Sequence, residues 1–205
     1  EIIVIAQDTT RYGIDIYDEY ALPKLLRELC RIDGIEWVRI HYCYPELVTD
    51  ELIDVIAEEN KICNYLDIPI QHINDKILKR MGRRTGKEQI VTLLSKLRRR
   101  IPDIVIRTSL IVGFPGETEE DFEETLEVVR KVRYDSAFTF IYSKRTGTPA
   151  AAMENQVPEE VVKERFDRLL AEVQAISAQV CGRDVHTVQE VLVEEPDSHV
   201  EGLVT

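Results

Sequence analysis

Short β-branched runs alternate along the chain with segments in which apolar residues recur every three or four positions. Runs of the first kind predict strands, and segments of the second kind predict amphipathic helices. The predicted strands cover 1–6, 37–42, 65–70, 104–112 and 137–142. The predicted helices are 22–29, one capped by Thr49, 75–80, one carrying Ile90, Leu93, Leu94 and Leu97, and an acidic one capped by Thr118. This alternation predicts an α/β fold of parallel βα units, either an open doubly wound sheet or a barrel.

A long helix and one further strand are predicted at the end of the chain. Pro158 suits the first position of the helix, and Glu159 and Glu160 suit its first turn. The buried stripe of this helix is predicted to contain Val162, Phe166, Leu169, Leu170, Val173, Ile176 and Val180. The run 187–195 then predicts a strand.

Composition and charge limit the class of protein. The 205 residues fall within the range of one domain, and 26 Lys and Arg against 38 Asp and Glu give a net charge of −12. This charge argues against the chain binding nucleic acid by itself, which requires clustered cations, and it suits a basic protein partner. Basic runs occur at 79–84 and 98–100, the second at a predicted helix C-terminus where cations meet the helix dipole favourably.

The setting of the protein is predicted from what the sequence lacks. No apolar run is long enough to cross a bilayer and no signal-peptide pattern opens the chain, so no membrane association is expected. Four scattered cysteines match neither a disulfide framework nor a zinc site, so a cytoplasmic location is expected. The chain starts directly with strand-like residues, from which we expect a piece of a larger protein.

Polar or glycine-rich segments follow each predicted strand. Because the carboxyl ends of parallel strands meet at one edge, these segments are expected to converge on a small-molecule site. They are 7–13, 41–45, 69–72, 113–117 and 142–148. In the run RTSLIVGFPGET at 107–118, the glycines allow close approach to bare backbone and the following helix start favours negative groups. Taken alone, the same run is equally a plain strand-to-helix connector.

Five of these segments together resemble the methylthiotransferases of the radical S-adenosylmethionine (SAM) superfamily. The runs AQDTTRYG, HYCYP, DIPIQH and RTSLIVGFPGE are similar to the RimO family, which methylthiolates an aspartate of a small-subunit ribosomal protein. The later run YDSAFTFIYSKRTGTPAA, with Arg145, is more similar to the MiaB family, which methylthiolates an adenosine in the tRNA anticodon loop. The resemblance therefore implies a basic ribosomal protein of the small subunit as the partner, with tRNA as the alternative.

The resemblance implies a six-stranded partial (βα) barrel followed by a small β-barrel TRAM domain. Residues 1–183 would hold strands two to six and the C-terminal helix, and 184–205 would begin the TRAM domain. The implied cofactors are SAM and 4Fe-4S clusters, with flavodoxin or ferredoxin as the electron donor. The cluster-binding Cys-x3-Cys-x2-Cys loop would lie before Glu1, and the cysteines present are too far apart in sequence to replace it. We therefore expect the chain alone to be inactive and to behave as a cofactor-binding module, which is the rival class of function.

Carried onto this sequence, the resemblance implies residues that bind SAM and no catalytic acid, base or nucleophile. Gln7 and Asp8 would approach the methionyl end, while Gln71 and His72 would reach the ribose. Arg107 shares a strand face with Ser109 and would meet the methionine carboxylate, or else pair with an acid on a neighbouring strand. The backbone from Gly113 through Pro115 and Gly116 to Glu117 would run beside the adenine and ribose. Tyr142 would pack either on the adenine or in the core.

Overall fold

Five strands, six α-helices and four short 3-10 helices make up the described part of the computed structural model, which comprises residues 1–195 and 204. The strands are β1 (Ile2–Val4), β2 (Val38–Ile40), β3 (Tyr65–Asp67), β4 (Val105–Val112) and β5 (Ser136–Ile141). The α-helices are α1 (Leu22–Cys30), α2 (Asp50–Glu58), α3 (Asp75–Arg80), α4 (Lys87–Arg100), α5 (Glu119–Val132) and α6 (Glu159–Cys181). The 3-10 helices are η1 (Thr9–Arg11), η2 (Pro45–Leu47), η3 (Pro149–Ala152) and η4 (Gly182–Asp184). The predicted alternation of strands and helices is confirmed.

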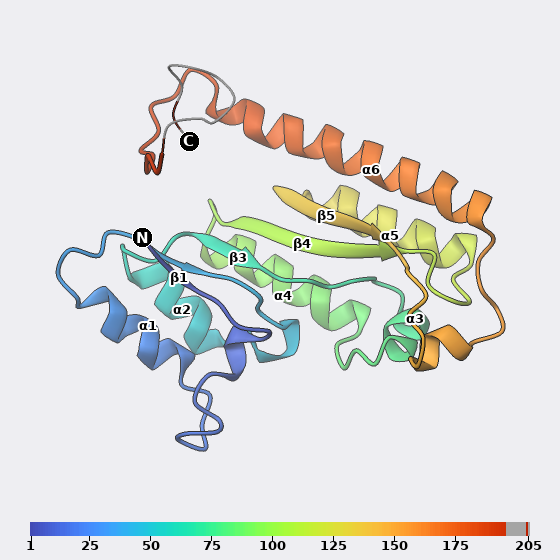
Figure 1. The fold of residues 1–205 in the computed structure, drawn as a ribbon. Helices are drawn as coiled ribbons and strands as arrows, with labels where there is room; N and C mark the ends of the chain where they lie inside the picture. Colours follow the sequence, from blue (N-terminus) through green and yellow to red (C-terminus); the bar gives the residue numbers. More distant parts are fainter. Residues whose placement is uncertain (196–203, 205) are drawn as a thin grey trace.

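All the strands run parallel, and their order in space follows the chain (Figure 1). β1 pairs with β2, and β3 pairs with β4, which pairs with β5. The two sets are joined by a bridge between Val38 and Ile62 and by a hydrogen bond of 2.8 Å from the Cys43 amide to the Asp67 carbonyl. The result is the sequential parallel order that βα units predict. Closure of these strands into a partial barrel remains a prediction.

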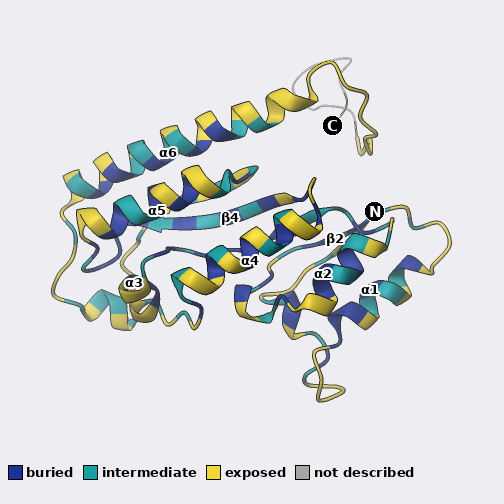
Figure 2. Ribbon diagram, turned by 180° about the vertical axis from the view of Figure 1, so that it is seen from behind, coloured by how far each residue is buried: buried dark blue, intermediate teal, exposed yellow. Residues whose placement is uncertain are grey.

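Helices cover one face of the sheet and leave the other open. The strands lie in front of the helices in Figure 1, whereas α1, α2 and α4 lie in front of the strands in Figure 2. In β4, Ile106, Thr108, Leu110 and Val112 are buried, while the alternate residues Arg107 and Ser109 are only half-buried. The first set packs beneath the helices, and the second projects from the open face.

Caps at the helix starts follow the sequence signals closely. The side chains of Thr49 and Thr118 accept hydrogen bonds from backbone amides three residues on, and Asp121 completes a capping box with Thr118. Pro158 is the N-cap of α6 and not its first helical residue, because its ψ of 143° is extended. In the described part of the chain, no helix is both long and apolar enough to span a bilayer.

Two strand predictions need correction. The ladder of β3 stops at Asp67 and not at residue 70, because the register with β4 shifts there: the Ile68 carbonyl accepts from the Thr108 hydroxyl at 2.8 Å, and the next bridge joins Gln71 to Leu110. The run 187–195 forms no strand, and all of these residues are exposed. A strand requires a neighbouring strand for its backbone hydrogen bonds, and 187–195 has none among the described residues. The TRAM domain predicted for 184–205 remains a prediction, and 196–203 and 205 lie outside the described residues.

Candidate functional site

A hollow of about 520 Å³ opens where the first three strands end, on the face that the helices leave uncovered. It is bounded by residues that follow β1, β2 and β3, by one residue from the middle of β4 and by one residue that follows α3. The lining residues are Ile5, Ala6, Gln7, Tyr42, Tyr44, Pro69, Gln71, Arg83 and Ser109. The predicted convergence of strand-end segments is therefore present for β1, β2 and β3, whereas the segment 113–117 after β4 does not line the hollow.

Gln7, Gln71 and Ser109, three of the predicted site residues, line this hollow. Gln71 adopts a left-handed conformation with φ of 68°. Its amide donates to the Ser109 carbonyl at 2.9 Å, and its carbonyl accepts from the Ile111 amide at 2.8 Å. A left-handed glutamine is strained, so these two backbone bonds to β4 are what hold its side chain at the hollow.

Asp8 lies beside the hollow at the start of η1. One carboxylate oxygen, Oδ1, accepts from the Thr10 amide at 3.1 Å, while the other, Oδ2, is buried without a hydrogen-bond partner. The next residue, Thr9, fixes this loop to β2, because its hydroxyl donates to the His41 carbonyl at 2.8 Å. A buried carboxylate oxygen without a partner is costly, and it marks a place where a ligand donor fits.

Arg107 lies one layer below Ser109 on the same face of β4 and is already paired. Its Nη2 donates to Asp67 Oδ2 at 2.8 Å and lies 3.3 Å from His41 Nδ1. The hydrogen bond to Asp67 raises the pKa of Arg107, and burial together with the Arg107 charge lowers the pKa of His41. Of the two alternatives for Arg107, the ion pair with an acid of a neighbouring strand is the one present.

His72 and Glu117 lie behind the strand ends and do not reach the hollow. The Glu117 side chain has 0% exposure; its Oε2 accepts from the Gly113 amide at 3.0 Å and lies 3.4 Å from His72 Nε2. Its Oε1 accepts from Arg165 of α6 at 2.9 Å. Both predicted side chains therefore belong to a buried polar cluster, and their contacts hold the turn after β4 in place.

The turn from Gly113 to Glu117 is packed against protein on its outer side. A Cβ at Gly113 would approach Val162 to 2.6 Å, and one at Gly116 would collide with Arg80 and Asn155. The Pro115 carbonyl accepts from Arg80 Nη1 at 3.2 Å, and the Gly116 amide donates to the Asn155 carbonyl at 2.7 Å. These glycines are required by close packing, and the turn does not line the hollow.

Tyr142 continues β5 and packs on the turn after β4. Its amide donates to the Val112 carbonyl at 2.8 Å, and its ring meets Phe114 edge-on with 5.3 Å between centroids. Its hydroxyl is buried without a partner. Of the two roles left open for Tyr142, the packing role agrees with these contacts.

Tyr42, Tyr44 and Arg83 line the hollow but were not among the predicted site residues. The two tyrosines belong to the predicted strand-end segment 41–45, so position alone was a usable signal. Arg83 belongs to the basic run 79–84, and nothing in the sequence places that run against β2. Its guanidinium lies over the Tyr44 ring at 4.8 Å.

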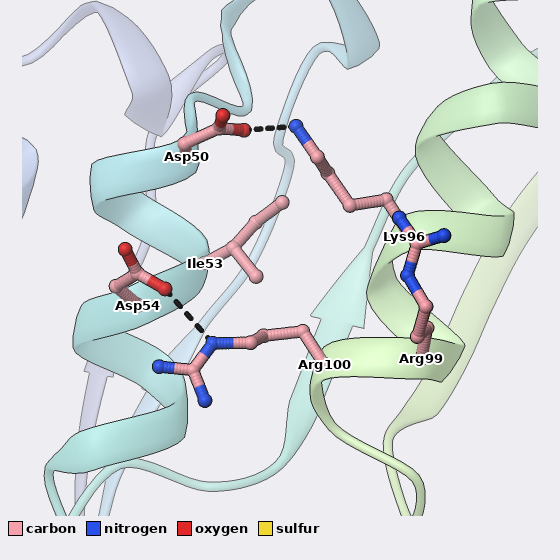
Figure 3. Close-up of a pocket in the computed structure, with 6 residues that line it drawn as sticks. All are labelled: Asp50, Ile53, Asp54, Lys96, Arg99 and Arg100. Atoms are coloured by element: carbon pink, nitrogen blue, oxygen red, sulfur yellow. Dashed lines mark hydrogen bonds and ion pairs between the residues drawn. The ribbon is translucent and has the colours of Figure 1, made fainter.

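A second hollow, of about 250 Å³, lies on the outer surface between α2 and α4 (Figure 3). Its lining side chains point toward one another across the gap, where Lys96 pairs with Asp50 and Arg100 pairs with Asp54 at 2.9 Å. These exposed ion pairs account for its polar groups, and it lies on the helical side of the sheet, away from the strand ends.

No metal site is formed by the residues that the structure describes: they contain no group of three or more His, Cys, Asp or Glu placed to hold an ion. Cys43 is fully buried, and its Sγ lies 3.5 Å from the Thr9 hydroxyl. Burial raises the pKa of the Cys43 thiol to about 12. Cys43 therefore packs as an apolar residue and does not supply a thiolate.

We expect iodoacetamide at neutral pH to modify Cys181 first and Cys43 last. Cys181 is exposed, whereas Cys43 is buried and stays protonated because its pKa is about 12. Mass spectrometry of timed digests measures the order, and labelling in denaturant provides the control in which all four cysteines react. Labelling of Cys43 at the rate of Cys181 would contradict the burial described above.

Comparisons with known proteins place this geometry in a family context. The sequence profile of the Radical SAM superfamily matches residues 1–129. The ribosomal protein uS12 methylthiotransferase RimO of Lachnoclostridium phytofermentans is 56% identical over 194 residues, and that of Alkaliphilus oremlandii is 53% identical over 194 residues. Each alignment covers 95% of this chain, and the chain spans 44% of the length of each relative.

A similar fold is found in a solved structure of low sequence identity. Coproporphyrinogen III oxidase (HemN) from Escherichia coli, a radical SAM enzyme, superposes with a TM-score of 0.59 at 23% identity. The superposition covers 76% of this chain and 36% of that one. This likeness concerns the fold, which the two chains share over that part.

Proposed function

This chain belongs to the radical SAM superfamily, and from that premise we propose that it is the SAM-binding part of a methylthiotransferase that modifies an aspartate of ribosomal protein uS12. The observation that carries the proposal is the identity of 53–56% to RimO enzymes over 95% of the chain. The acidic surface of a chain with net charge −12 suits a basic ribosomal target through electrostatic steering. The reaction replaces a C–H bond of the acceptor by a C–SCH3 bond.

The hollow at the strand ends has the size and chemistry that SAM requires. Its volume of about 520 Å³ lies within the range of small-molecule pockets, about 300–1,000 Å³. Gln7, Gln71 and Ser109 offer hydrogen-bonding groups, and Tyr42 and Tyr44 offer aromatic faces. The partnerless Oδ2 of Asp8 offers an acceptor for a cationic or N–H group of the ligand.

Binding and orientation are the tasks of these residues. SAM, when bound, supplies the group that removes hydrogen from the acceptor carbon and the methyl of the transferred unit. Gln71 and Ser109 would hold the ribose hydroxyls, and Gln7 and Asp8 would hold the methionyl end. The apolar walls formed by Ile5, Ala6 and Pro69 would contact the apolar parts of the ligand.

The described residues do not fit a 4Fe-4S cluster. No three or more of their His, Cys, Asp and Glu side chains are placed to hold a metal ion, and the cysteines are widely separated in the sequence. We derive no step through a cluster for this chain. Cluster ligands and the flavodoxin or ferredoxin donor are proposed for the whole protein only, on the strength of the family resemblance.

The test is methylthiolation of a uS12 peptide by the full-length protein, with SAM and a reductant. The expected product is a peptide that carries one methylthio group on its aspartate, detected by tandem mass spectrometry. We expect Ser109→Phe, which fills the hollow, to weaken SAM binding by at least about tenfold. Val105→Phe is the matched control, because it adds the same ring to the same face of β4 at the opposite end.

Two outcomes would reject the proposal. One is equal SAM affinity in the Ser109→Phe and Val105→Phe variants, which would show that SAM does not bind in the hollow. The other is modification of a tRNA anticodon-loop adenosine in place of uS12, as the resemblance of segment 134–151 to MiaB enzymes allows. Tight tRNA binding that weakens steeply with salt would favour this alternative.

A further inference from the structure

Arg83 is positioned at the hollow by a backbone turn and by a cation–π contact, and not by an acidic side chain of the described residues. Gly82, with φ of +74°, turns the chain after α3, and the Arg83 amide donates to the Leu78 carbonyl at 2.9 Å. The guanidinium carbon then lies over the Tyr44 ring, 4.8 Å from its centroid. Such stacking leaves the edge of the guanidinium, where its N–H donors point, available to a ligand.

The charge of Arg83 has no acidic partner among the described residues, although the chain carries twelve more acidic than basic groups. Two arginines near the hollow are engaged: Arg107 pairs with Asp67, and Arg80 donates to the Pro115 carbonyl. Lys76, in the first turn of α3, pairs with Asp121, and Lys87, at the start of α4, pairs with Glu124. Arg83 is thus the lining residue of the hollow that carries an unneutralised positive charge.

We propose that Arg83 binds a carboxylate in the hollow, in a site that needs both its charge and its planar fork. This inference rests on the proposed function, which offers two ligands with a carboxylate: the acceptor aspartate and the methionyl group of SAM. A carboxylate taken from water into a partly closed hollow loses hydration and requires a cation with matching donors. Arginine meets this need with two parallel N–H···O bonds, and its aromatic support keeps the fork in place.

Two ligand pairs distinguish the sources in the full-length protein. One pair is SAM and decarboxylated SAM, and the other is a uS12 peptide and the same peptide with asparagine in place of the acceptor aspartate. Dissociation constants are measured for the wild type, Arg83→Met, Arg83→Gln and Arg84→Met. Arg84 is the matched control, because it is the exposed neighbour in the same basic run and does not line the hollow.

In the wild type and Arg84→Met, loss of the carboxylate is expected to weaken binding of one ligand pair by about 10- to 100-fold. In both Arg83 variants, the two ligands of that pair are expected to bind with nearly equal dissociation constants. Loss of discrimination for the SAM pair assigns Arg83 to the cofactor, and loss for the peptide pair assigns it to the acceptor. Circular dichroism of the two variants confirms that they are folded.

Two further results separate failure of this inference from failure of the proposed function. If the wild type binds SAM and peptide while the Arg83 variants discriminate as it does, only the role of Arg83 is overturned. If the wild type binds neither SAM nor the uS12 peptide, the proposed function and this inference are overturned together.

Discussion

Replacing Arg165 with methionine is expected to lower the free energy of unfolding by about 3–5 kcal/mol. Arg165 is 5% exposed, and its Nη1 donates to Glu117 Oε1 at 2.9 Å and to the Glu117 carbonyl at 3.1 Å. Its Nε also donates to Glu119 at 2.9 Å. Without Arg165 the Glu117 carboxylate, whose side chain has 0% exposure, would lose its cation while remaining buried. Urea denaturation followed by circular dichroism measures the loss.

Arg168→Met is the matched control for this prediction. Arg168 lies on the same helix and pairs with Glu119, Glu123 and Glu164, but its side chain is 34% exposed. Exposed ion pairs contribute little, so we expect a loss of no more than about 1 kcal/mol. The double variant with Glu117→Gln should recover part of the Arg165 loss, because it removes the unpaired charge. Equal losses for Arg165→Met and Arg168→Met would show that burial of the Glu117 pair does not matter.

Gly113→Ala is expected to destabilise the protein by about 2–5 kcal/mol. The left-handed conformation with φ of +79° costs alanine roughly 1–2 kcal/mol. The new methyl would also lie 2.6 Å from one methyl of Val162 and 2.8 Å from the other, and such overpacking costs about 1–3 kcal/mol. Val162 is a β-branched residue on α6, so it has little freedom to turn away. The loss is read from the denaturation midpoint at unchanged slope.

Gly34→Ala separates the two causes in this second prediction. Gly34 has φ of +81°, nearly the same as Gly113, but a Cβ there would meet nothing within 4 Å. It should therefore show the conformational cost alone, roughly 1–2 kcal/mol. A Gly113→Ala loss no greater than the Gly34→Ala loss would mean that α6 does not press on the turn after β4.

Local chemistry explains why much of the fold was predictable. Thr49 and Thr118 are N-cap residues that mark the starts of α2 and α5 in the sequence. The spacing of apolar residues predicts that Leu52 and Phe122 are buried, as they are in the structure. These signals act within one helical turn, so neighbouring residues are enough to read them. Strand ends were less accurate, because a ladder ends where its partner stops bonding, as the shift in register between β3 and β4 after Asp67 shows.

The sequence predicted where the candidate site lies in the fold, but it predicted correctly only some of the residues that line it. Gln7 and Gln71 reach the hollow because parallel strands end at a common edge, and Ser109 reaches it from the open face of β4. His72 and Glu117 share that edge in the sequence, yet their side chains turn toward α5 and α6 into a buried cluster. The position of a residue along a strand predicts how near it lies to the edge of the sheet. The conformation of the turn after the strand determines toward which face its side chain points.

The sequence by itself determined the order of strands and helices, their parallel arrangement and the edge at which the polar segments after β1, β2 and β3 meet, because these follow from periodicity, caps and the geometry of βα connections. Only the tertiary structure decided which charges meet. It paired Arg107 with Asp67, buried Arg165 against Glu117 and left Arg83 stacked on Tyr44 without an acid. These partners lie 39 to 48 residues apart in the chain (Arg83 and Tyr44, and Arg165 and Glu117), and the energy of a charge depends on distance and burial, which only the folded chain fixes.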